Sequence, residues 1–274
     1  MRPPPVLRPG AVVAVTGGAR GIGRTAAARF AALGLTVHIG DRDGAAETAA
    51  RIGAHGHELD VTDRDSFAAF LDAAGPVDVL VNNAGIMPLG PFLAESDAVS
   101  RATFDVNTWG PLLGMRLVLP GMLERGRGHV VNVASMAGKV PFQGMAVYNA
   151  SKYAAVGLSG AVREELAGTG VTVSAVLPTA VRTGLTDGVP LGGPLPTIGP
   201  EAVARAILRS CRTRRAEYPV PGWMALVQPA LALVPERLVL LGKRAGGGDR
   251  AMAVHARGDH DRRVAEQAEM RSGS

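Results

Sequence analysis

The chain has 274 residues, 47% hydrophobic and 19% charged, which suits one large α/β domain and argues against a disordered chain. Its single cysteine, Cys211, excludes an intrachain disulfide framework. The net charge of +5 resides in the segment from Arg205 onward, which holds 13 basic and 7 acidic residues. Because aromatic side chains are few and no nucleic-acid-binding motif is present, we do not expect nucleic acid as a partner.

The N-terminal residues 1–10 are rich in proline and lack the apolar core and cleavage site of a secretory signal. No apolar run reaches the roughly 20 residues that a membrane-spanning helix needs. We therefore expect a cytoplasmic protein.

Short apolar runs then alternate with longer helical stretches. The predicted strands are residues 11–16, 36–40, 57–59, 77–81, 129–133 and 171–177. The predicted helices are residues 22–33, 45–52, 66–74, 98–123 and 146–167. Apolar strands that are each followed by a helix are typical of a parallel sheet covered on both faces. With right-handed crossovers, this pattern predicts a Rossmann-type, doubly wound α/β domain.

A glycine cluster, TGGARGIG over residues 16–23, lies between the first predicted strand and the first predicted helix. Glycines in this position allow a tight turn and a close approach of the backbone to a pyrophosphate at the helix N-terminus. The cluster predicts a dinucleotide site. The residues expected to contact the cofactor here are Gly17, Arg20, Gly21, Ile22 and Gly23.

The predicted helix 146–167 carries Tyr148 and Lys152, whose spacing of four places them on one face. An ammonium beside a phenol favours the phenolate, so we expect Lys152 to lower the pKa of Tyr148 from its ordinary value of about 10. Tyr148 could then act as a general acid/base near neutral pH. Ser135 follows the fifth strand, where its hydroxyl could position a substrate oxygen.

These motifs together resemble the short-chain dehydrogenase/reductase family. The resemblance covers about residues 12–183 and includes the glycine cluster, the Asn-Asn-Ala-Gly sequence at 82–85, Asn107, Ser135 and the Tyr148-xxx-Lys152 pair. It implies an NAD(P)-dependent oxidoreductase that transfers hydride between the nicotinamide and an alcohol/carbonyl pair. The implied catalytic residues are Asn107, Ser135, Tyr148 and Lys152, with Asn107 holding a water that relays protons to Lys152.

The resemblance also implies further cofactor contacts, from the adenine at Asp60 to the nicotinamide carboxamide at Val181 and Thr183. The implied set is Asp60, Val61, Asn83, Ala84, Gly85, Tyr148, Lys152, Pro178, Val181 and Thr183. Thr179 departs from the family pattern, because a glycine usually follows the proline at this point.

The choice between NAD and NADP depends on three residues near the adenosine ribose. Asp41 follows the second strand, where a carboxylate can accept from the ribose hydroxyls and repels a 2′-phosphate. Arg20 and Arg42 are instead suited to clamping that phosphate. We favour NAD and leave NADP open.

Several apolar residues are expected around the nicotinamide, namely Met87, Met136, Pro141, Phe142 and Met145. They predict a lipophilic secondary alcohol or ketone as the small-molecule substrate. Residues 179–222 are expected to form a substrate loop, rich in Pro and Gly over 179–200, within a single domain of residues 1–245.

The apolar segment 223–241 allows three interpretations: it covers the substrate, lies in a subunit interface, or, less favoured, contacts a membrane surface. Residues 246–274 are predicted to be a polar, basic tail that is frayed or forms a terminal helix. The family resemblance implies a homodimer or homotetramer. The six histidines form no pattern typical of metal ligands, so no metal is expected. The rival hypothesis is a non-catalytic dinucleotide-sensing regulator, which predicts that the catalytic residues have degraded.

Overall fold

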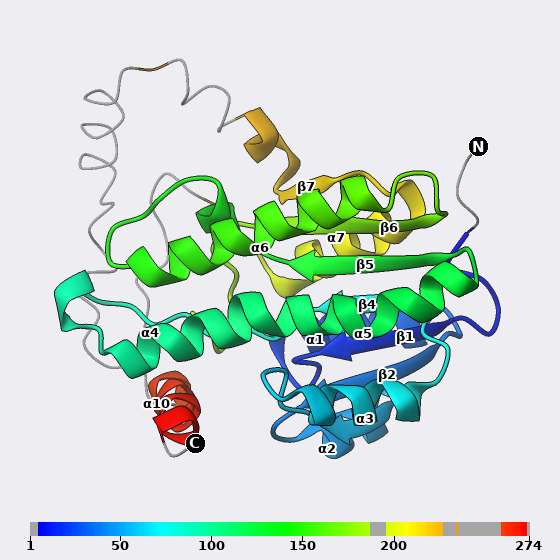
Figure 1. Cartoon of the computed structure of the whole chain (residues 1–274), viewed down its shortest axis with the longest axis horizontal. Coiled ribbons are helices and arrows are strands. Elements are labelled where there is room, and N and C mark those ends of the chain that lie inside the picture. The colour runs from blue at the N-terminus through cyan, green and yellow to red at the C-terminus, as the bar shows by residue number, and fades with distance from the viewer. Residues whose placement is uncertain (1–4, 187–195, 227–233, 235–258, 273–274) are drawn as a thin grey trace.

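The computed structural model describes residues 5–186, 196–226, 234 and 259–272 (Figure 1). Seven parallel strands in these ranges form one sheet in the order β3-β2-β1-β4-β5-β6-β7. The strands are β1 (Val12–Thr16), β2 (Thr36–Asp41), β3 (His55–Glu58), β4 (Val79–Asn82), β5 (Gly128–Val133), β6 (Val171–Pro178) and β7 (Glu217–Val220). The strand order reverses direction between β1 and β4, which is where doubly wound sheets bind ligands. The predicted Rossmann-type fold is confirmed.

Helices cover both faces of this sheet (Figure 1). One face carries α1 (Gly21–Ala31), α2 (Ala45–Ile52) and α7 (Pro200–Thr213), and the other carries α3 (Arg64–Ala74), α5 (Gly110–Glu124) and α6 (Ala146–Glu165). Because successive side chains of a strand point to opposite faces, Val13 and Val15 enter the first core and Ala14 enters the second. Burial on both faces explains why the central strands β1, β4, β5 and β6 are largely apolar.

The second half of the predicted substrate loop 179–222 is not a loop, and this expectation was wrong. Residues 200–213 form α7, and residues 217–220 form the edge strand β7. The helix has recognisable signals, since Pro200 occupies its first turn and Val203 and Ile207 are buried four residues apart. The strand has only four residues and includes Pro219, which is tolerated at a sheet edge and hides the strand pattern.

The predicted helix 98–123 is divided by a π-helical turn. It consists of α4 (Asp97–Phe104), the π turn η2 (Asp105–Trp109) and α5, and Asn107 lies in the π turn. Single π turns inside α-helices are frequent at functional sites. The remaining short elements are the 3-10 turns η1 (Phe92–Ala94), η3 (Met136–Gly138) and η4 (Gly222–Leu226).

Within the predicted tail 246–274, the described part is a terminal helix, α10 (Asp259–Ser272), which packs against α4 (Figure 1). Residues 246–258 lie outside the described ranges, as do residues 187–195 of the predicted substrate loop and most of the apolar segment 223–241. Among the helices that the structure describes, none is long and apolar enough to cross a membrane.

Candidate active site

A cleft of about 360 Å³ opens at the carboxyl ends of the central strands. It brings together Ser135, Tyr148 and Lys152 with every residue predicted to contact the cofactor except Gly23. Asn107 and Gly23 are not among the residues that line the cleft. Parallel strands that end at one edge of a sheet place residues far apart in sequence side by side, which explains this convergence.

The glycine cluster has the geometry of a pyrophosphate cradle. Gly17 and Gly21 adopt φ angles of +63° and +51°, which side chains disfavour. A Cβ on Gly23 would lie 2.1 Å from the carbonyl oxygen of Gly17, so Gly23 keeps the turn closed without lining the cleft. Helix α1 begins at Gly21 without a side-chain cap from any described residue, which leaves its first N–H groups available to an anion. The cluster therefore fits a bound dinucleotide.

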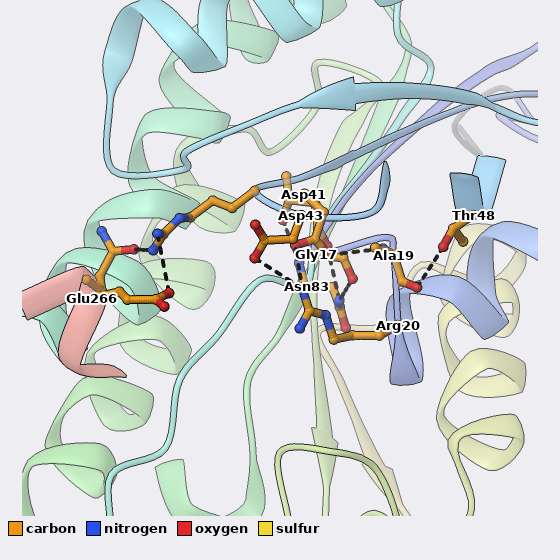
Figure 2. Close-up of polar contacts among 11 residues, drawn as sticks. Gly17, Ala19, Arg20, Asp41, Asp43, Thr48, Asn83 and Glu266 are labelled. Carbon is orange, nitrogen blue, oxygen red and sulfur yellow. Dashed lines mark hydrogen bonds and ion pairs between the residues drawn. The ribbon is translucent and has the colours of Figure 1, made fainter. Parts of the chain in front are cut away.

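Asn83 ties the loop after β4 to the glycine cluster (Figure 2). Its side-chain Nδ2 donates to the carbonyl oxygens of Thr16 and Gly17, each at 3.0 Å. The hydroxyl of Thr16 in turn accepts from the backbone N–H groups of Asn83 and Ala84. These bonds join the two loops on either side of the switch point and fix the floor of the cleft.

The candidate acid/base group lies at the apolar end of the cleft. Tyr148 and Lys152 are almost fully buried on α6, and the Lys152 Nζ lies 5.7 Å from the centre of the Tyr148 ring. Lys152 donates to the carbonyl oxygen of Val133 at 3.2 Å. The Ser135 Oγ follows β5 and accepts from the N–H of Ala137 at 3.0 Å. Strand β5 and helix α6 thus present the three polar side chains to one point.

The protonation state of Tyr148 differs from the expectation. Burial raises the pKa of Tyr148 to about 12, although a hydrogen bond with Ser135 acts in the opposite direction. Burial also lowers the pKa of Lys152 to about 8. Burial disfavours the charged phenolate, and this effect outweighs that of the Ser135 hydrogen bond. At neutral pH, Tyr148 is therefore a proton donor.

Asn107 connects the loop after β4 to α6. Its Oδ1 accepts from the N–H of Ile86 at 3.0 Å, and its Nδ2 donates to the carbonyl oxygen of Ile86 at 2.9 Å and to the Ser151 hydroxyl at 3.1 Å. A Cβ on Gly85 would lie 3.2 Å from the Asn107 Oδ1, so this close approach depends on a glycine. The side-chain amide of Asn107 thus uses both its Oδ1 and its Nδ2 in hydrogen bonds within the protein, which tie the loop after β4 to α6.

Apolar side chains surround the Tyr148 end of the cleft. The lining residues are Met87, Met136, Phe142, Met145 and Leu185. Four of them were predicted from the sequence, whereas Pro141, also predicted, is exposed and does not line the cleft. Thr179, at the position where the family has glycine, donates its hydroxyl to the carbonyl oxygen of Pro196 at 2.8 Å.

The opposite, adenosine end of the cleft is charged (Figure 2). Asp41 Oδ2 accepts from the N–H of Ala19 at 3.0 Å, and its Oδ1 lies 3.4 Å from the Arg20 guanidinium. Arg20 also pairs with Asp43 at 3.7 Å. Asp60 accepts from the backbone N–H and the hydroxyl of Thr62 at 2.8 and 2.7 Å.

Sequence reasoning missed two residues of the adenosine end, Glu266 and Gln267. Gln267 lines the cleft from α10, and its Oε1 accepts from the Arg42 guanidinium at 2.6 Å. The Glu266 carboxylate lies 4.0 Å from the same guanidinium. No sequence signal connects Gln267 to Arg42, because the two are 225 residues apart and α10 carries no cofactor motif.

Three histidines stack beside this end of the sheet. The His38 ring on β2 lies 4.7 Å from that of His55 and 5.1 Å from that of His57, both on β3. Burial, together with His55 and His57, lowers the pKa of His38 to about 4, so the imidazole is neutral at physiological pH. Among the described residues, no group of three or more His, Cys, Asp or Glu side chains is arranged to hold a metal ion.

Comparison with known proteins supports the family resemblance seen in the sequence. Residues 11–191 match the short chain dehydrogenase family. Estradiol 17-beta-dehydrogenase 11 of Rattus norvegicus is 34% identical over 249 residues, which cover 86% of this chain and 83% of that protein. The chain is therefore a member of the short-chain dehydrogenase/reductase family, whose activity is NAD(P)-dependent oxidoreduction.

Solved structures agree with this assignment. A family member from Burkholderia phymatum in complex with NAD superposes with a TM-score of 0.74 at 28% identity, over 81% of this chain and 92% of that one. Another, from Burkholderia cenocepacia in complex with NADP, has a TM-score of 0.74 at 30% identity, over 85% of this chain and 96% of that one. Because one neighbour holds NAD and the other NADP, the fold alone does not select the cofactor.

Proposed function

We propose that the protein interconverts a lipophilic secondary alcohol and the corresponding ketone, with NAD as the preferred cofactor and Tyr148 as the proton donor and acceptor. The observation that carries the proposal is the convergence of Ser135, Tyr148 and Lys152 at the apolar end of a cleft whose other end is a dinucleotide cradle. When bound, the nicotinamide would supply or accept the hydride.

The protein's own groups handle the proton. In the reductive direction, Ser135 holds the substrate oxygen by hydrogen bonding, and the Tyr148 hydroxyl gives that oxygen its proton. The raised pKa of Tyr148 keeps it protonated and ready for this step. Oxidation of an alcohol requires the phenolate instead, so the rate of oxidation should rise with pH. Lys152 would stabilise the charge left on Tyr148, and a water held by Asn107 would resupply the proton.

The proposed substrate class rests on the apolar walls of the cleft, in which Met and Phe side chains surround Tyr148. The name of the rat relative, an estradiol dehydrogenase, agrees with a hydrophobic alcohol. In a panel that runs from small polar alcohols to hydrophobic ones such as estradiol, kcat/KM should increase with the apolar surface of the substrate. The preference for NAD rests on the Asp41 carboxylate, which would accept from the ribose hydroxyls and repel a 2′-phosphate. A cytoplasmic location and a homodimer or homotetramer remain predictions from the sequence.

The decisive experiment replaces Tyr148 with Phe. Loss of the acid/base group should lower kcat by about 10²–10⁴-fold, while the affinity for NADH, measured by fluorescence titration, stays within about threefold. The matched control is Tyr153→Phe on the same helix, since Tyr153 is exposed and does not line the cleft. Full turnover in Tyr148→Phe would refute the mechanism. Cofactor binding without turnover in the wild-type protein, over the whole substrate panel, would favour the non-catalytic regulator.

A further inference from the structure

Helix α10 forms part of the cofactor cleft, although it lies outside the part of the chain that defines the family. The family match ends at residue 191, and α10 begins at Asp259. Gln267 nevertheless lines the cleft beside Arg42, Asp43 and Asp60. The adenosine end of the site therefore has a wall that the family motifs do not account for.

This wall is a packed element of the fold. Val264, Gln267 and Ala268 are only 5%, 4% and 6% exposed, and their spacing places them on one face of α10. That helix packs against α4, which leads into the π turn that holds Asn107 (Figure 1). A buried amide is costly unless its polar atoms are hydrogen-bonded, so the partners of Gln267 bear on how the helix is held.

Gln267 connects two loops that bound the adenosine end. Its Oε1 accepts from the Arg42 Nη1 at 2.6 Å, just beyond strand β2. Its Nε2 donates to the Thr62 hydroxyl at 3.4 Å, and that hydroxyl donates to the Asp60 carboxylate at 2.7 Å, just beyond strand β3. One side chain of α10 thus holds Arg42 and the Asp60 loop together.

The same contacts occupy both arginines that could bind a 2′-phosphate. Arg20 pairs with Asp41 and Asp43, whereas Arg42 faces Gln267 and the Glu266 carboxylate. Figure 2 shows Glu266 reaching from its helix toward the part of the cleft that holds Asp41 and Asp43. Three carboxylates thus pair with two guanidinium groups, which leaves one excess negative charge among these five side chains. A 2′-phosphate would meet this excess and would also have to displace existing partners of Arg42.

We propose that α10 is a cofactor-specificity element: Glu266 and Gln267 hold Arg42 in place and so favour NAD over NADP. This inference rests on the proposed function, because it requires that the cleft bind a nicotinamide dinucleotide. Glu266 and Gln267 act through Arg42 and are positioning residues. Without Glu266 and Gln267, the Arg42 guanidinium would be free to form a bidentate pair with a 2′-phosphate.

The test compares the dissociation constants of NADH and NADPH by fluorescence titration in the full chain. In the double variant E266A/Q267A, the affinity for NADPH should rise about tenfold, while the affinity for NADH changes less than threefold. Adding Arg42→Ala to the double variant should abolish the gain, which a general loosening of α10 would not predict. The matched control is Ala265→Gln, which places an amide on the exposed face of the same helix and should leave both affinities unchanged.

A second variant guards against misfolding of the first. Glu266→Gln removes one charge at a half-exposed position and should raise NADPH affinity by about threefold with an unchanged melting temperature. The proposal is overturned if either folded variant binds NADH but keeps the wild-type ratio of the two affinities, or if the wild-type protein already prefers NADPH. Binding of neither cofactor by the wild-type protein would instead refute the proposed function itself.

Discussion

The two ends of the cofactor cleft are built on different principles. At the nicotinamide end, Tyr148 and Lys152 are 6% and 5% exposed and face apolar side chains. At the adenosine end, the Arg20 and Arg42 side chains are 41% and 31% exposed and are paired with carboxylates and an amide. The first end controls the pKa of an acid/base group through burial. In our proposal, the charges at the second end determine which charged group a ligand may carry.

This difference separates chemistry from selection within one site. The proposed catalytic residues lie inside the segment 11–191 that matches the family, whereas part of the surface proposed to select the cofactor lies on α10. Changes at one end should therefore leave the property set by the other end intact. The first of the predictions below tests that separation directly.

The largest effect is expected from Lys152→Ala. Removing the ammonium that stabilises charge on Tyr148 should lower kcat by about 10²–10³-fold. The ratio of NADH to NADPH affinity should stay unchanged, because the residues that discriminate lie at the other end of the cleft. Steady-state kinetics together with titration of both cofactors measures the two quantities. A shift in the affinity ratio would show that the two ends are coupled.

A smaller effect, shared by both cofactors, is expected from Gly23→Ala. The added Cβ would lie 2.1 Å from the Gly17 carbonyl oxygen and 2.6 Å from the Asn83 Nδ2, so the cradle must open. We expect the affinities for NADH and NADPH to fall by at least about tenfold, with a lower melting temperature.

The control for this substitution is Gly160→Ala on α6, where an added Cβ meets no described atom within 4 Å. It should leave cofactor affinity unchanged and raise the free energy of unfolding by up to about 1 kcal/mol, because alanine favours the helix. If the Gly23→Ala variant and the control bound the cofactors equally well, the closed turn of the glycine cluster would not contribute to cofactor affinity.

The last prediction concerns acid stability at the histidine stack of β2 and β3. The folded-state pKa of His38 is about 4, below its ordinary value of 6.5. Well above pH 6.5 the imidazole is therefore neutral in the folded and the unfolded state and does not change the free energy of unfolding. Between about pH 6.5 and about pH 4, His38 is protonated in the unfolded chain but stays neutral in the folded protein, so the free energy of unfolding falls as the pH is lowered. At pH 5 the loss should be up to about 2 kcal/mol.

Thermal melts at pH 7 and pH 5 test this expectation. The melting temperature of the wild-type protein should fall by a few °C more than that of His38→Asn. Burial lowers the pKa of His129 to about 3, and this group contributes in the same direction in both proteins. An identical pH dependence of the two melts would contradict the role of His38.

The sequence predicted the sheet, its first six strands and the residues that line most of the cleft. These features depend on local signals: the period of apolar residues, a glycine cluster after a strand, and a spacing of four on a helix. The same logic would have found α7, whose buried Val203 and Ile207 repeat every four residues behind Pro200. Strand β7 is short and interrupted by Pro219, so its identity depends on pairing with β6.

Two features could not be predicted from local patterns. The contact between Arg42 and Gln267 joins residues 225 positions apart, and nothing in either segment specifies the other. The pKa of Tyr148 was misjudged because the spacing to Lys152 indicates proximity, whereas the balance between attraction and desolvation depends on the surrounding packing. Identifying the residues and assigning their charge states are thus different problems.

The bonds that Asn83 makes to Thr16 and Gly17 have a thermodynamic consequence. The glycine cluster is held in its folded shape by the protein's own hydrogen bonds, so a ligand need not order it. A flexible phosphate-binding loop would lose conformational entropy on binding, but the glycine cluster has already lost this entropy during folding. Association should therefore resemble a lock-and-key encounter, with a backbone at residues 16–23 that superposes closely with and without a nucleotide.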